Sequence, residues 1–186
     1  MVILWSLRLG MFLFKRVKDV GQDIRFIEMK KDFFWFLMTW TLSGLWVFLT
    51  YVAGLSAMTS VNLIENMSSY HFAFMLIGFF FWVLGFVIEI LADNQKKIFR
   101  KNPINKGKFI RSGLWAWSRH PNYFGEIILW LGISIIALPS MEGGEFLGLI
   151  SPIFVYVLLT KISGIPMLET VSYTHLRAHE TRGNLV

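Results

Sequence analysis

The sequence of 186 residues contains no cysteine. This absence excludes disulfide bonds, zinc sites with cysteine ligands and catalysis by a thiol. Charged residues are also scarce, at 16% of the chain, against about 25% in average soluble domains. The sequence further lacks three fingerprints of soluble enzymes: the G-x-G-x-x-G turn, the Walker A loop and the H-E-x-x-H zinc motif. Any nucleotide site must therefore be built within a helical bundle.

In place of charge the chain has apolar residues, which make up 55% of the total and are gathered in blocks. A helix needs about 20 mostly apolar residues to cross the hydrocarbon layer of a membrane. Candidate spans cover residues 33–57, 71–91, 123–138 and 146–162, and the last two are short for a full crossing. The apolar start of the chain indicates part of a further helix. The sequence thus predicts an all-α integral membrane protein, a multi-helix bundle with about four spans plus a partial N-terminal helix.

Tryptophans stand near the ends of several of these blocks, as interfacial aromatic residues often do in membrane proteins. We therefore expect them at the level of the lipid headgroups. They are Trp5, Trp40, Trp82, Trp115, Trp117 and Trp130.

Lysine and arginine alternate strictly from one connection to the next. They fill the connections at 15–31 and 94–120, whereas those at 58–70 and 139–145 contain none. Because basic loops stay on the cytoplasmic side, the first two connections are predicted to face the cytoplasm. Anionic membrane lipids are the expected partners of this charge, so the net charge of +6 does not indicate nucleic acid.

Both ends of the chain differ from its middle. The chain starts within an apolar pattern, so we expect the membrane domain, residues 1–170, to be incomplete at its N-terminus. The tail, residues 171–186, loses all apolar periodicity and resembles a translated sequencing adapter. His175 and His179 have the spacing of metal ligands on a helix, but we interpret this pair as an accident of a non-native tail and predict no metal site.

A polar cluster follows the second span. Four residues of this cluster are separated by four, four and three positions, so a continuing helix would place them on one face. They are Glu89, Asp93, Lys97 and Arg100. One interpretation is an ordinary helix end, where cations complement the helix dipole. The other is one wall of a binding site.

The next connection favours a binding site. Pro121 is a typical first residue of a helix, and the start of a helix with nearby arginines suits a phosphate group. Glu126 lies one turn into this helix, and an ionisable group at membrane depth is a functional candidate. The other polar residues of the connection are Lys106, Lys108, Arg111, Arg119, Asn122 and Tyr123. Together these groups predict one cytoplasm-facing pocket for a phosphate-bearing cofactor.

Several of these segments carry a family resemblance. The strings "ADNQKKIFR", "GLWAWSRHPNYFGEIILWLG" and "LISPIFVYVLLTKISGIPMLE" resemble the C-terminal domain of the steroid 5-alpha-reductase family, in particular its bacterial branch. The earlier string "LWSLRLGMFLFKRVKDVGQDIRFIEMKKD" resembles the preceding cytoplasmic segment of that branch. The resemblance covers about residues 3–169, and it implies a multi-pass protein of the bacterial inner membrane.

The resemblance also implies an activity: an NADPH-dependent reductase that delivers hydride to a carbon–carbon double bond of a lipid or steroid-like substrate. The cofactor-binding residues it implies are Asp93, Lys97, Arg100, Arg119, His120, Asn122 and Tyr123. Tyr123 and Glu126 are the implied catalytic residues, and Tyr51 is a further candidate for the proton donor.

Two alternatives remain at this point. A membrane methyltransferase that uses S-adenosylmethionine would share the R-H-P-N-Y string, but it typically adds a paired glutamate motif, where this chain has "SGIPMLE" with one glutamate. A non-catalytic membrane scaffold is the second alternative. The polar cluster argues against a scaffold, since such groups are costly in a membrane without a ligand.

Overall fold

The computed structural model describes residues 1–20, 30–60, 68–105 and 108–162. Within these residues the chain is helical and contains no strand, which confirms the all-α prediction. Four helical stretches are long and apolar enough to cross a membrane: Phe33–Thr59, Ser69–Lys101, Pro121–Ser140 and Gly143–Lys161. The expectation that the last two are short is wrong, because 3-10 turns extend both stretches, to 20 and 19 residues.

The chain divides into two compact units, Met1–Tyr51 and Val52–Val186. The first contains α1 (Val2–Val20) and most of α3 (Phe33–Thr59). The expected N-terminal helix is therefore present as α1, which is not among the four stretches that could cross a membrane.

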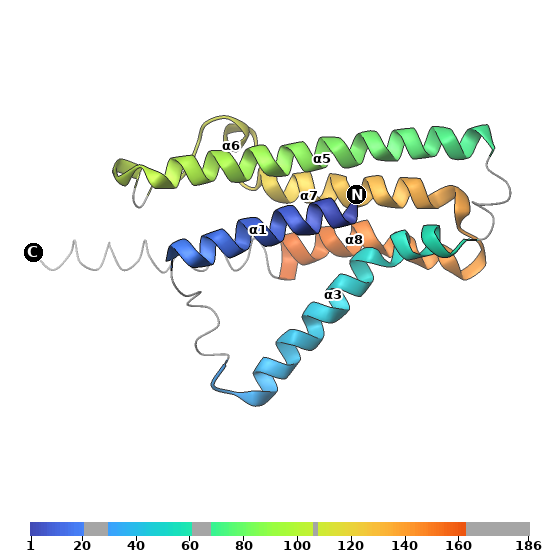
Figure 1. The fold of residues 1–186 in the computed structure, drawn as a ribbon, viewed down its shortest axis with the longest axis horizontal. Helices are drawn as coiled ribbons and strands as arrows, with labels where there is room; N and C mark the ends of the chain where they lie inside the picture. The colour runs from blue at the N-terminus through green and yellow to red at the C-terminus, as the bar shows by residue number, and fades with distance from the viewer. Residues whose placement is uncertain (21–29, 61–67, 106–107, 163–186) are drawn as a thin grey trace, which may run out of the picture. The chain divides into compact units, whose positions relative to one another are not determined.

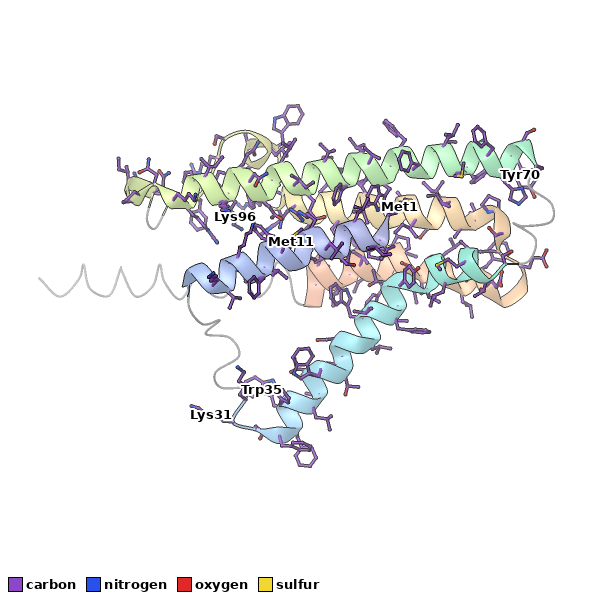
Figure 2. All side chains as sticks on the ribbon, viewed as in Figure 1. Met1, Met11, Lys31, Trp35, Tyr70 and Lys96 are labelled. Carbon is purple, nitrogen blue, oxygen red and sulfur yellow. The ribbon has the colours of Figure 1, made fainter. Side chains whose placement is uncertain are left out.

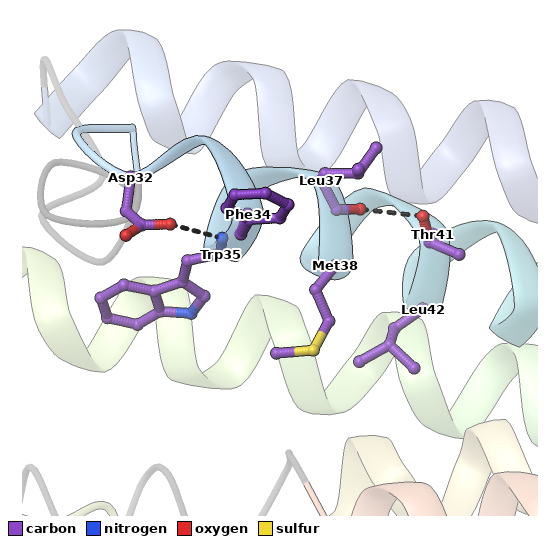
Figure 3. Close-up of a pocket in the computed structure, with 7 residues that line it drawn as sticks. All are labelled: Asp32, Phe34, Trp35, Leu37, Met38, Thr41 and Leu42. Atoms are coloured by element: carbon purple, nitrogen blue, oxygen red, sulfur yellow. Dashed lines mark hydrogen bonds between the residues drawn. The ribbon is translucent and has the colours of Figure 1, made fainter.

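Helix α3 begins at a side-chain cap and is apolar around its whole circumference. The backbone N–H of Trp35 donates a hydrogen bond of 2.8 Å to Oδ1 of Asp32, which satisfies one of the free amides of the first turn. Farther along, the hydroxyl of Thr41 donates to the carbonyl of Leu37 at 2.9 Å, so this hydroxyl needs no water. Figure 3 shows both bonds beside a shallow hollow lined by seven residues between Asp32 and Leu42. None of the predicted site residues lines this hollow.

The second unit is built on α5 (Ser69–Lys101) and α7 (Pro121–Ala137). Figure 1 shows these helices side by side and antiparallel, in green and yellow. Between them lie the 3-10 turn η1 (Pro103–Asn105) and the single turn α6 (Leu114–Trp117). After α7 come η2 (Leu138–Ser140), η3 (Gly143–Leu149), α8 (Ile150–Val157), which packs against α7, and the π-turn η4 (Leu158–Ile162).

Glycines set the close packing of α5 against α7. A Cβ atom added to Gly78 would lie 2.5 Å from the carbonyl oxygen of Gly132, and one added to Gly132 would lie 2.6 Å from the carbonyl oxygen of Gly78. Gly85 and Gly125 form a second reciprocal contact. The two glycines of α5 are seven residues apart, and so are the two glycines of α7. One stripe of each helix therefore meets the other at backbone contact, as small residues allow in membranes.

The end of the second unit away from the polar cluster is tied by a polar contact and a small apolar core. The hydroxyl of Ser60, just after α3, donates a hydrogen bond of 3.1 Å to the carbonyl oxygen of Ser140 in η2. Ala53, Ala137 and Met141 form a buried cluster beside it. These contacts fix the turn that follows α7, and the polar cluster lies at the opposite end of α5.

Helix α5 is much longer than a membrane crossing requires. Its 33 residues span about 50 Å at about 1.5 Å per residue, whereas the hydrocarbon layer is about 30 Å thick. Figure 2 labels Tyr70 near its start and Lys96 in its charged part, before its last residue, Lys101. Since the apolar part begins near Tyr70, the charged last turns extend beyond the hydrocarbon layer.

Four of the tryptophans contradict the expectation of an interfacial position. Trp5, Trp82, Trp115 and Trp130 are 7%, 4%, 8% and 2% exposed, respectively, and are therefore part of the protein interior. Trp40 and Trp117, by contrast, are 59% and 93% exposed, as interfacial residues would be. Closeness to the end of an apolar block therefore does not separate the two environments.

Candidate functional site

The polar cluster on α5 is divided between a buried and an exposed part. Glu89 and Asp93 are buried, on the same stripe as Gly78 and Gly85. Lys97 and Arg100, one and two turns farther on, are exposed. The helix therefore carries carboxyl groups where it packs against its neighbour and cations where it leaves the packed region.

The connection that follows α5 is held against the same helix by hydrogen bonds. The backbone N–H of Leu114 donates to Oε1 of Gln95 at 3.0 Å. The indole Nε1 of Trp115 donates to the carbonyl oxygen of Ala92, also at 3.0 Å. The ammonium of Lys96 lies 4.6 Å from the centre of the Trp115 ring, a cation–π contact. These bonds hold α6 against the charged end of α5.

Gly113 makes this return possible. Its φ is +60°, a conformation that other residues rarely adopt. A Cβ atom there would also lie 2.7 Å from both terminal atoms of the Gln95 side chain. The glycine is therefore needed for a fixed turn.

Helix α7 begins with Pro121 as its first residue, as predicted. His120 is the N-cap residue, but its side chain makes no capping hydrogen bond. Its carbonyl oxygen accepts from the N–H groups of Tyr123 and Phe124 at 3.1 and 3.2 Å. The rings of His120 and Tyr123 stack with centres 5.3 Å apart and planes 9° apart. Two of the predicted cofactor-binding side chains are thus in direct contact.

The register of the helices brings the start of α7 to the buried carboxyl groups. A Cβ atom on Gly125 would lie 2.8 Å from the backbone nitrogen of Glu89. Because the helices are antiparallel, continuing this register places Glu89 level with the first turn of α7. Oδ1 of Asn122, in that turn, is buried and has no hydrogen-bond partner among the described residues.

The predicted residues therefore occupy two adjacent helix ends. Asp93 is buried, whereas His120, Asn122, Tyr123 and Glu126 are half-buried. The three cations, Lys97, Arg100 and Arg119, are exposed. Their roles in binding and catalysis remain predictions. The arrangement fits a pocket whose base is polar and buried and whose rim is basic and exposed.

Sequence reasoning missed the residues that hold this arrangement together. Gln95 and Trp115 fix the returning connection, and Gly85 and Gly125 fix the separation of the helices. The seven-residue spacing of glycines in both segments was an available signal. Nothing in the sequence pattern marked Gln95, since a polar residue near a charged helix end is ordinary.

No group of three or more histidine, aspartate or glutamate residues could hold a metal ion within the part of the chain that the structure describes. His175 and His179 lie outside the described residues, as do Lys106 and the tail from residue 171.

Comparison with protein families adds to this geometry. Residues 1–182 match the family described as "Protein of unknown function (DUF1295)". The chain belongs to the DUF1295 family. The match extends past residue 170, where the sequence pattern suggested that the membrane domain ends, and the nature of the DUF1295 chain's tail remains a prediction.

Relatives of this DUF1295 chain include two kinds of reductase or dehydrogenase. Delta(14)-sterol reductase of Arabidopsis thaliana is 24% identical over 126 residues, which are 62% of this chain and 30% of the relative. Human 3-oxo-5-alpha-steroid 4-dehydrogenase 1 is 37% identical over 71 residues, 38% of this chain and 27% of the relative. The resemblance to the steroid 5-alpha-reductase family is thereby confirmed.

A relative of another class is also similar. The probable O-methyltransferase ustE of Ustilaginoidea virens is 32% identical over 120 residues, 55% of this chain and 41% of the relative. The DUF1295 chain thus spans less than half the length of each of these relatives. No solved structure matches it.

Proposed function

We propose that this chain forms the nucleotide-binding part of a membrane reductase, which uses NADPH to reduce a carbon–carbon double bond in a lipid or steroid-like substrate. Its relationship to a sterol reductase and to steroid dehydrogenases supports the reaction class. The alternating basic connections support a site that faces the cytoplasm, where NADPH is available.

The observation that carries the proposal is the amide of Asn122. Its buried Oδ1 has no hydrogen-bond partner among the described residues, and a buried polar atom without a partner costs about 1–3 kcal/mol. An amide or hydroxyl donor of a bound ligand would satisfy it. The nearby start of α7, which the side chain of its N-cap residue leaves uncapped, adds a preference for negative charge.

The residues present fit a dinucleotide in their chemistry. Arg119 and Arg100 are exposed cations at the rim, where they would bind phosphate groups through charge-assisted hydrogen bonds, with Lys97 adding positive charge. Buried Asp93 would accept hydrogen bonds from ribose hydroxyls, and Asn122 would fix the orientation of a carboxamide. His120, which stacks on Tyr123, would hold that ring in place.

The nicotinamide supplies the hydride when it is bound. The chain's own contribution is the polar surroundings of the reacting atoms at the start of α7. The Tyr123 hydroxyl would donate a hydrogen bond to the oxygen on which negative charge develops, and Glu126 would hold a proton nearby. Packing of α7 against α5 would exclude water from this region, which strengthens both interactions.

The decisive experiment is nucleotide titration of the natural full-length protein in nanodiscs, with binding and melting temperature as readouts. A charge-assisted contact contributes about 1.5–3 kcal/mol, so Arg119→Ala should weaken NADPH binding by roughly one to two decades. Arg8→Ala, which removes a cation from α1, is the control and should change little.

Asn122→Leu gives a sharper test, because its two effects have opposite signs. Removal of an unsatisfied buried oxygen should leave the free protein as stable as before, or more stable by up to about 1–3 kcal/mol. The same change should weaken NADPH binding. A loss of stability in the free protein would show that Oδ1 already has a partner, and the site would then lose its main support.

The methyltransferase is the second candidate, favoured by the 32% identical relative. Binding of S-adenosylmethionine with no response to NADPH would replace the reductase by this function. Binding of neither compound would leave a structural role for the polar cluster.

A further inference from the structure

Trp82 lies deep in the apolar part of α5. It occupies the packed stripe of the helix, four residues after Gly78 and three before Gly85, and is 4% exposed. Seven residues separate it from Glu89, which corresponds to about 10 Å along the helix. Tryptophans in membrane proteins usually lie at the interface, where headgroups and water bind the indole N–H. Trp82 lies near the middle of the apolar stretch instead.

The indole N–H of Trp82 has no acceptor among the residues that the structure describes. Its Nε1 atom is buried and makes no hydrogen bond with any residue that the structure describes. Water is absent from the hydrocarbon layer, so an unpaired donor there is costly. Trp115 shows the usual solution in the same unit, since its Nε1 donates to the Ala92 carbonyl.

Two neighbouring aromatic rings of α5 stack on the indole of Trp82 without using its N–H group. Trp82 stacks on Phe86, with centres 4.9 Å apart and planes 15° apart, and on Phe79 at 6.4 Å and 17°. These contacts involve the faces of the indole. An N–H group lies in the plane of its ring and points outward from the edge, so stacking does not cover it. The three near-parallel rings form an apolar wall with one donor at its edge.

We propose that the Nε1–H of Trp82 binds an acceptor oxygen of the apolar substrate within the membrane, such as a ketone carbonyl remote from the reacting double bond. The inference rests on the proposed function, because the proposed reductase acts on an apolar substrate with a polarised double bond. Trp82 then fixes how deep the substrate lies, about two turns below Glu89, and the aromatic wall binds the substrate skeleton. The pairing also explains why a buried indole donor has no partner among the described residues of the protein.

The test uses two probes of one shape: cholestan-3-one labelled with ¹³C at its carbonyl, and cholestane, which has no oxygen. Neither has a double bond to reduce, so binding is measured without turnover. In nanodiscs the wild type should bind the ketone roughly 3- to 10-fold more tightly than the hydrocarbon. Its labelled carbonyl stretch should shift to lower frequency, as hydrogen bonding requires. Trp82→Phe should abolish both the preference and the shift.

Trp40→Phe is the matched control, because Trp40 is an exposed tryptophan of α3, and it should retain both signals. If Trp82→Phe does not fold, a benzothienylalanine at position 82 keeps the shape of the indole and replaces its N–H by sulfur. An unchanged ketone preference in either variant would overturn the proposal. A fall in melting temperature without any ketone preference in the wild type would also overturn it, since the acceptor would then be part of the protein.

The two proposals fail separately. A protein that ignores NADPH but shows the Trp82-dependent ketone preference refutes the reductase and retains the donor role of Trp82. A protein that binds NADPH without that preference refutes this inference alone.

Discussion

Gly125→Ala should separate α7 from α5 at the proposed site. The added Cβ would lie 2.7 Å from the Gly85 carbonyl oxygen and 2.8 Å from the Glu89 nitrogen. Ordinary contact begins at 3.4 Å. Both neighbours are backbone atoms of a helix, which cannot turn aside as a side chain can. The two helices must therefore move apart by about half an ångström or more, a shift comparable to those that overpacking causes in protein cores.

The size of the effect follows from two opposing terms. Overpacking costs about 1–3 kcal/mol, whereas replacing glycine by alanine within a helix contributes about 1 kcal/mol of stability. Gly44→Ala isolates the second term, because a Cβ atom there meets nothing within 4 Å. Gly125→Ala should therefore be about 1–3 kcal/mol less stable than Gly44→Ala. Thermal unfolding in detergent, followed by circular dichroism, measures this difference.

NADPH titration of the same variants separates an effect on the proposed site from an effect on folding stability. Gly132→Ala creates a similar clash, 2.6 Å from the Gly78 carbonyl oxygen, but seven residues farther along α7. Both variants should lose stability, and Gly125→Ala should lose more nucleotide affinity, because it displaces the turn that carries Asn122. A Gly125→Ala protein as stable as Gly44→Ala would refute the packing argument, and equal affinity losses in Gly125→Ala and Gly132→Ala would refute its link to the site.

The remaining predictions concern the connection, the topology and the tail. Gly113→Ala should lower stability by about 1–2 kcal/mol through its positive φ and its contact with Gln95; a melting temperature equal to that of the wild type would contradict the fixed turn. In a chain without cysteine, a cysteine placed at Ser112 should resist an impermeant reagent outside intact cells and one placed at Glu142 should react; the reverse labelling would invert the topology. Truncation after Thr170 should leave expression and NADPH binding unchanged, and a loss of either would show that the tail is native and needed.

The spans and the start of α7 were predictable because each depends on local sequence. An apolar block of sufficient length predicts a crossing, and Pro121 predicts a first helical residue; both were confirmed. The second helix continues about ten residues past the predicted span, through its charged end to Lys101. Charge ends a membrane crossing, but it does not end a helix.

The packed faces were not predictable from hydropathy. In water, an apolar stripe marks the side of a helix that faces the core, but in a membrane the lipid-facing side is apolar as well. Trp82 and Trp40 therefore look alike in the sequence, although one is 4% and the other 59% exposed. Residue size is the informative signal, because small residues allow two backbones to approach, as they do at Gly85 and Gly125.

The length of α5 couples the proposed site to the thickness of the bilayer. A single straight helix carries both the lipid-embedded stripe and the charged end, so the height of Asp93 above the membrane is set by where the apolar part comes to rest. Lipids with longer chains would draw the carboxyl groups toward the hydrocarbon layer, and the bilayer would thin locally around the helix, at a cost of fractions of a kcal/mol per ångström of mismatch. Lipid chain length would then act on nucleotide affinity without contact between lipid and nucleotide, and membranes of different thickness would support different activities of the same protein.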